Sequence, residues 1–256
     1  MKITLGAAAV QAVKVMAHLS EAAMVASVAA KAPLRLVGVD PDTAGDLLRS
    51  DQALSANPTR PVLLVHGYCG SKTSWTLIAR TLRDRGLIVN AFTYGPIGTS
   101  VEGLADGLVA EVERMLRQTG ADKVHLVGHS LGGVVIAQAI AGGRLDGVVD
   151  TVVTLGSPFG GSPWAKLLPF GEIVRALRED SPLLRRLALT PIPDGVRWLA
   201  FTATFDFIVP GLRSVPAHAR VQAITVSGVG HLGMLLSRQV LEHILAAIPA
   251  AMEAVS

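Results

Sequence analysis

Short aliphatic runs alternate with longer stretches of helical periodicity along most of this chain. Residues 60–67, RPVLLVHG, form an apolar run that stops at a glycine, as a buried parallel strand does. Residues 71–86 begin at a serine, repeat apolar positions every three or four residues and end at a glycine, which predicts a helix. The alternation continues and predicts strands at 87–94, 123–128, 148–158, 196–206 and 221–228, and helices at 100–120, 131–143 and 233–255.

Strands that alternate with helices at this spacing favour an α/β fold, with a mostly parallel central sheet covered by helices on both faces. The stretch from residue 158 to residue 196 interrupts the alternation, because it is too long for a plain loop between a helix and a strand. We expect residues 159–195 to form a cap insertion of one or two short helices over the edge of the sheet. Residues 34–256 are expected to form one domain that includes this insertion.

The first 33 residues follow a different pattern. Gln11, Lys14, His18 and Glu21 recur at helical spacings and align as one narrow polar stripe on an otherwise apolar helix. Lys2 and the apolar residues after it resemble the start of a signal peptide, but the stripe interrupts the run and leaves it too broken for a membrane span. Three interpretations stay open: an amphipathic helix packed on the domain, a helix at a membrane surface, and a cleaved signal. The location of the protein stays open with them.

Composition excludes several classes of function. Half of the 256 residues are hydrophobic and 17% are charged, so the chain can fill a large core and is not of a disordered type. The net charge is +3, but the basic residues are scattered and aromatics are only 4%, which argues against nucleic-acid binding. Cys69 is the only cysteine, so neither an internal disulfide nor a cysteine-based zinc site can form.

A serine at residue 130 stands between a predicted strand and a predicted helix. Residues 128–132, GHSLG, give the Gly-x-Ser-x-Gly pattern in the strand–turn–helix setting that a nucleophile elbow requires. Such a turn strains the serine backbone, and its glycines let the strand and helix approach closely. The amino terminus of the helix then favours developing negative charge. The alternative interpretation is a buried serine in an ordinary turn.

Four segments resemble the motifs of bacterial lipases in the α/β-hydrolase superfamily. Residues 128–133, GHSLGG, resemble the elbow, and residues 65–68, VHGY, resemble the segment before the first sheet-covering helix. Residues 154–161, TLGSPFGG, resemble the strand end that follows the elbow helix, and residues 228–235, GVGHLGML, resemble the catalytic histidine loop of small lipases. The resemblance extends over about residues 60–247. It implies the α/β-hydrolase fold and a small triacylglycerol lipase or serine esterase.

Serine needs a base within hydrogen-bond reach, and the superfamily order is serine, acid, histidine. His231 lies in a glycine-flanked loop after a predicted strand and is the expected general base, with His218 as the alternative. Asp206 ends the strand at 196–206, where a partly buried carboxylate would accept from the imidazole Nδ1–H and fix its tautomer. Three further aspartates lie at the wrong sheet edge or in the cap: Asp150, Asp180 and Asp194.

The oxyanion hole requires two backbone amides that converge on one point. Leu131 should supply one, and the resemblance implies that Tyr68 supplies the other, although residues 66–75 could be a plain strand-to-helix turn. We expect a serine carboxylic-ester hydrolase, a lipase that cleaves acylglycerols or similar lipid esters through an acyl-enzyme, with no metal or organic cofactor. A thioesterase or amide hydrolase would use the same triad. A non-catalytic binding protein on this scaffold usually lacks a triad member.

The expected cap mixes apolar and basic side chains. It could dock transiently on a lipid interface, cover an acyl pocket, or pack its leucines inward with the arginines in solvent. The natural ester, the acyl chain length and the oligomeric state are not indicated by the sequence. The apolar residues concerned are Trp164, Leu167, Leu168, Phe170, Ile173, Val174 and Leu177, and the basic ones are Arg175, Arg178, Arg185 and Arg186.

Overall fold

Six parallel strands form the central sheet, in the order β2-β1-β3-β4-β5-β6. The structure is a computed structural model and describes residues 60–95, 99–166 and 171–249. The predicted α/β class is confirmed, and the predicted helix within residues 1–33 lies outside the described residues. The strands are β1 (Val62–Val65), β2 (Val89–Phe92), β3 (Val124–His129), β4 (Val149–Leu155), β5 (Arg197–Ala203) and β6 (Val221–Val226).

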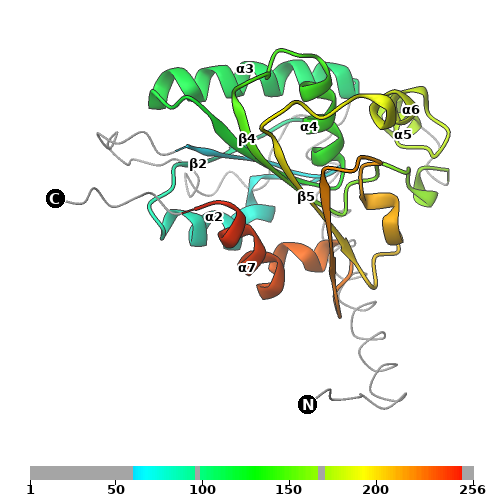
Figure 1. The fold of residues 1–256 in the computed structure, drawn as a ribbon. Helices are drawn as coiled ribbons and strands as arrows, with labels where there is room; N and C mark the ends of the chain where they lie inside the picture. The colour runs from blue at the N-terminus through cyan, green and yellow to red at the C-terminus, as the bar shows by residue number, and fades with distance from the viewer. Residues whose placement is uncertain (1–59, 96–98, 167–170, 250–256) are drawn as a thin grey trace.

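Helices cover both faces of the sheet, as the sequence predicts. Helices α3 and α4 lie over one face, and α2 and α7 lie over the other (Figure 1). Strand β1 is buried along its whole length between these layers, which explains why its apolar residues form an unbroken run. The four helices are α2 (Thr76–Arg83), α3 (Val101–Thr119), α4 (Leu131–Ala141) and α7 (Arg238–Ala247).

Helix boundaries follow local capping signals. Ser100 caps α3 by accepting a hydrogen bond from the Gly103 amide at 3.0 Å, and Gly120 ends it with φ 70°. The single helix expected at 233–255 is instead a 3-10 helix, η4 (Leu232–Leu236), followed by α7. The break occurs because the Ser237 side chain accepts from the Val240 amide and starts a new helix there.

The expected cap insertion between β4 and β5 contains a 3-10 turn and two short helices. Of its expected apolar residues, Ile173, Val174 and Leu177 are buried and Trp164 is 50% exposed, whereas residues 167–170 lie outside the described chain. No helix in the described ranges is both long and apolar enough to cross a membrane. The cap elements are η2 (Pro163–Lys166), α5 (Glu172–Ala176) and α6 (Pro182–Leu189), and a further 3-10 turn, η3 (Gly211–Ser214), follows β5.

Candidate active site

Ser130 connects the carboxyl end of β3 to the amino end of α4 in a strained conformation. Its backbone angles are φ 52° and ψ −124°, in a region that favours glycine. Such a conformation costs on the order of 1–3 kcal/mol and persists only where the surroundings determine it. Here the Ser130 amide donates to the Leu155 carbonyl at 2.8 Å, and the Ser130 carbonyl accepts from the Gly133 amide at 3.1 Å. The sharp turn expected from the sequence is present.

The glycines of this turn permit contacts that no side chain could tolerate. A Cβ added at Gly132 would lie 2.0 Å from the carbonyl oxygen of Val65, at the end of β1. A Cβ at Gly128 would lie 2.6 Å from the amide nitrogen of Gly133. The helix can therefore begin directly against the sheet, with Ser130 partly exposed at its first turn.

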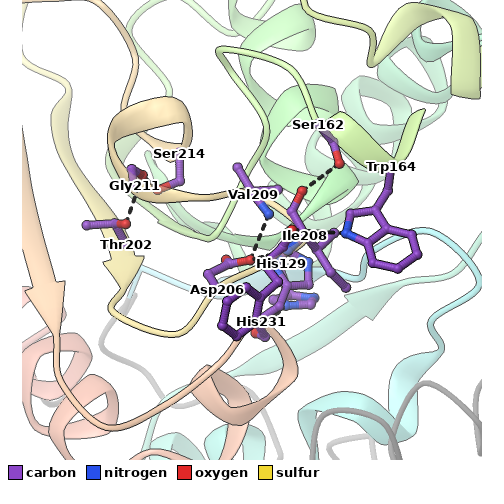
Figure 2. A network of polar contacts seen from close by, with 11 residues as sticks. His129, Ser162, Trp164, Thr202, Asp206, Ile208, Val209, Gly211, Ser214 and His231 are labelled. Atoms are coloured by element: carbon purple, nitrogen blue, oxygen red, sulfur yellow. Dashed lines mark hydrogen bonds and ion pairs between the residues drawn. The ribbon is translucent and has the colours of Figure 1, made fainter. Parts of the chain in front are cut away.

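An aspartate and a histidine from the ends of the next strands meet beside this turn. Asp206 follows β5, and His231 lies in the loop after β6. Their side chains are 0% and 3% exposed, and the Nδ1 of His231 lies 2.8 Å from the Oδ2 of Asp206 (Figure 2). A carboxylate oxygen accepts hydrogen bonds, so Nδ1 donates to Oδ2, which in the neutral imidazole leaves the lone pair on Nε2.

His129 connects this pair to the elbow. Its Nε2 lies 3.1 Å from the carbonyl oxygen of His231 and donates to it, and the two rings are 4.7 Å apart. Burial, followed by a smaller electrostatic contribution from the neighbouring His231, lowers the pKa of His129 to about 3, so the His129 ring is a neutral donor at pH 7. His129 precedes Ser130 directly, and this contact therefore brings His231 alongside the elbow.

The segment after β1 passes Ser130 on another side. A Cβ added at Gly67 would lie 2.9 Å from the Cβ of Ser130, so the backbone there touches the elbow. The Gly70 amide then closes a turn on the Gly67 carbonyl at 3.0 Å. Within this turn Cys69 has φ 53°, and it and Ser130 are the two non-glycine residues with positive φ in the described chain. Both strained positions therefore belong to one site.

Tyr94, which the sequence did not single out, braces that segment. Its hydroxyl donates to the carbonyl of His66, its backbone amide donates to His66 Nε2 at 3.4 Å, and the two rings stack with centroids 4.1 Å apart. His66 Nδ1 in turn donates to the Gly67 carbonyl at 2.9 Å. Both ring nitrogens of His66 therefore have a hydrogen-bond partner, and His66 orients the loop.

The other expected candidates lie elsewhere in the described structure. His218 Nδ1 accepts from the Arg220 amide at 3.2 Å on the loop before β6. Asp150 lies at the amino end of β4, where it pairs with Arg60 at 2.7 Å. Asp180 is exposed in the cap, and Asp194 pairs with Arg220. The structure groups none of these four with His231 at the elbow.

Known proteins resemble this chain in sequence and in topology. Residues 62–186 match the sequence model described as the alpha/beta hydrolase family. The mature lipase BlEst2 of Bacillus licheniformis superposes with a TM-score of 0.67 at 16% identity, over 77% of this chain and 94% of that one. The chain therefore has the α/β-hydrolase fold. Lipase B of Aspergillus fumigatus, also at a TM-score of 0.67, shares 15% identity over 80% of this chain and 56% of its own.

Curated relatives match about half of the chain or less. A triacylglycerol lipase of Pseudarthrobacter phenanthrenivorans is 33% identical over 113 residues, which are 41% of this chain and 35% of that protein. The mouse sn-1-specific diacylglycerol lipase ABHD11 is 30% identical over 136 residues, or 52% of this chain and 42% of its own length. The chain therefore spans well under half the length of these relatives.

Proposed function

We propose that the hydrolase domain cleaves carboxylic esters with Ser130 as nucleophile, His231 as general base and Asp206 as the acid of the triad. The observation that carries the proposal is the strained serine on the elbow together with the pair beside it. His129, next to Ser130, donates to the His231 carbonyl, and the His231 ring is bonded to the buried Asp206 carboxylate. A serine hydroxyl is a weak nucleophile at neutral pH and needs such a base. The lipases among the relatives support the same reaction class.

Each step of the reaction has a group to perform it. The Ser130 oxygen bonds to the ester carbon while its proton passes to the free Nε2 of His231, and Asp206 stabilises the resulting imidazolium. The carbonyl oxygen becomes an oxyanion, which then expels the alcohol, and His231 gives that alcohol its proton. Water repeats the two steps on the acyl-enzyme and releases the acid. No metal or organic cofactor takes part in this scheme.

Two backbone amides would receive the oxyanion. Leu131 is the first residue of α4, where amides have no acceptor within the helix and the helix dipole favours negative charge. Tyr68 follows Gly67, whose backbone touches Ser130. Electrostatic stabilisation of this kind is often the largest catalytic contribution, and one lost donor costs about 10²–10³ in kcat.

A cavity beside the elbow helix suits the acyl part of a lipid ester. It has a volume of about 440 Å³ and is lined mainly by apolar residues of α4, α6 and the loop after β5. Alanines at positions 137 and 141 face it from α4. With a rise of about 1.5 Å per residue, Ala137 lies about 10 Å along the helix from Ser130. We propose that the acyl chain extends from Ser130 towards this cavity. The lipases among the relatives support an acylglycerol or similar lipid ester as the substrate.

Hydrolysis of nitrophenyl esters from acetate to laurate tests the proposal. We expect turnover that Ser130→Ala and His231→Ala abolish, and labelling by an organophosphonate that Ser130→Ala removes. His243→Ala is the matched histidine control in α7 and should stay active. Stoichiometric labelling of Ser130→Ala would refute the nucleophile, and a wild-type protein inert towards all these esters would favour a binding role.

The acyl site has a separate test. Ala141→Phe fills the far part of the cavity, so we expect it to lower kcat/KM for laurate and to spare acetate. Equal losses on both esters would contradict the placement of the acyl chain. Matched thioester and anilide substrates then decide whether the natural bond is an ester, a thioester or an amide.

A further inference from the structure

Two successive peptide groups join the start of the cap to the carboxylate of Asp206. Asp206 Oδ1 accepts from the amides of Ile208 and Val209, at 3.0 and 2.7 Å. The carbonyls of the same two peptide groups belong to Phe207 and Ile208. They accept from Trp164 Nε1 at 3.0 Å and from Ser162 Oγ at 2.5 Å (Figure 2).

The contacts therefore form two parallel relays, each of which runs from a cap side chain through one peptide group to the same carboxylate oxygen. A donor on a peptide carbonyl polarises that group, and its amide then donates more strongly. Bonds of this kind to an ionised acceptor are stronger than those between neutral groups. Each cap donor thus strengthens and orients one of the two bonds to Oδ1.

The relays determine where the other carboxylate oxygen points. The main chain at Asp206 is held by its own amide, which donates to the Ala203 carbonyl at 3.2 Å. The rotation of the carboxylate is set by its partners instead, with two amides on Oδ1 and His231 on Oδ2. If the peptide groups at 207–209 turned, Oδ1 would follow them and Oδ2 would leave the line of the His231 Nδ1–H bond.

We propose that Ser162 and Trp164 are positioning residues for Asp206, so that the start of the cap sets the alignment of the triad. This proposal rests on the proposed function, because the alignment matters only if Asp206 serves His231 in catalysis. Ser162 has the larger effect, since it is 5% exposed whereas Trp164 is 50% exposed and its bond competes with water.

The test removes each donor in turn and compares the resulting variant with one that lacks a matched serine elsewhere in the cap. In Ser162→Ala we expect kcat for a short ester to fall about 3- to 10-fold with KM unchanged, and in Trp164→Phe about 2- to 3-fold. Ser162→Thr keeps the hydroxyl and should retain kcat. Ser181→Ala is the control, because Ser181 is as buried and also donates to a carbonyl, that of Ala176, but only within the cap. It should lose stability and keep kcat.

A double-mutant cycle shows whether the effect passes through the acid. In an Asp206→Ala background, Ser162→Ala should have no further effect on kcat, because the group that it positions is gone. A loss of the same size in both backgrounds, or an equal loss of kcat in Ser181→Ala, would overturn the proposal. So would Ser162→Ala with an unchanged kcat.

A spectroscopic readout separates this proposal from the proposed function. The proton between His231 Nδ1 and Asp206 Oδ2 should give a downfield proton resonance that Ser162→Ala shifts or broadens and Ser181→Ala leaves in place. This measurement needs no turnover. A responsive resonance in a wild-type protein that cleaves no ester would reject the proposed function alone, whereas an unresponsive resonance would reject the relay.

Discussion

The elbow around Ser130 and the loop that carries Asp206 achieve precision by different means. At the elbow, the residues that determine the geometry lie within a few positions of one another: a strained serine, and glycines at which an added Cβ would come as close as 2.0 Å to a neighbouring atom. At the acid, position depends on side chains far away in sequence, since Ser162 lies 46 residues from Ile208 and Trp164 lies 43 from Phe207. The first region leaves a pattern in the sequence, and the second does not.

This difference also affects tolerance to mutation. Close backbone contact admits no substitution without movement of the sheet or the helix, because interiors are packed densely. Hydrogen bonds from exchangeable side chains can be lost one at a time, each at about 1 kcal/mol. We therefore expect changes at the elbow to cause large, abrupt effects and changes around the acid loop to cause graded ones.

Ser130→Gly should give the largest effect, because it separates the chemistry of the elbow from its strain. Activity should fall by about 10⁴-fold or more, since the nucleophile is lost. Stability should rise by up to about 1 kcal/mol, because glycine adopts a positive φ without the steric cost that serine pays. Urea unfolding measures the gain, with Ser130→Ala as the control that lacks the hydroxyl but keeps the strain. Equal stability of the two variants would show that the elbow stores no strain.

Gly132→Ala tests the packing of the elbow against β1. The added methyl group would lie 2.0 Å from the backbone carbonyl oxygen of Val65, which is not a flexible neighbour. We expect a loss of about 3 kcal/mol or failure to fold, at the upper end for an overpacked core. Gly95→Ala is the control, because an added Cβ there meets nothing within 4 Å. A Gly132→Ala variant with wild-type unfolding would mean that the helix can move away from the sheet.

The fold was predictable where local pattern and tertiary environment agree. Strands β1 and β3 are buried on both faces, so their apolar runs predicted them, and Ser100 and Gly120 predicted the ends of α3. The tail was predicted as one helix because its apolar spacing continues across Ser237, which instead caps a new helix. Helix α5 has only five residues, too few for its periodicity to be distinguished from a loop.

The site was predictable only in part. The order of the motifs brought Ser130, Asp206 and His231 to attention, and the structure brings the last two into contact beside the elbow. Tyr94 and the two cap donors had no such signal. Any side chain with a donor can serve a carbonyl, and the partner can lie anywhere in the chain. Contacts of this kind can therefore be found only in a three-dimensional structure.

Substitution of His129, which precedes Ser130 at the elbow, should have a moderate effect on how stability depends on pH. The pKa of His129 is lowered from the ordinary histidine value of 6.5 to about 3, mainly by burial. Between these values the unfolded chain binds a proton that the folded protein does not, so stability falls as pH falls through that window, on the order of 1 kcal/mol per pH unit. His129→Gln keeps a donor for the His231 carbonyl but cannot titrate, and should flatten this slope in urea unfolding at pH 7 to 4. Parallel slopes would contradict the neutral state of His129.

Substitution of Glu179, which lies in the cap, should have the smallest effect on stability. Hydrogen bonds from Arg213 and then Lys166 lower the pKa of Glu179 below the ordinary value of 4.5, and all three groups are open to solvent. Its stabilising contribution is present above the unfolded pKa and is lost as pH falls through the lower folded value. Glu179→Gln should therefore lower the Tm slightly at pH 7, less in high salt, and progressively less as pH falls below the unfolded pKa. A large drop in Tm at pH 7 would mean that this ion pair holds the cap as rigidly as the glycines hold the elbow, and a drop that stays constant as pH falls would mean that the charge of Glu179 contributes nothing.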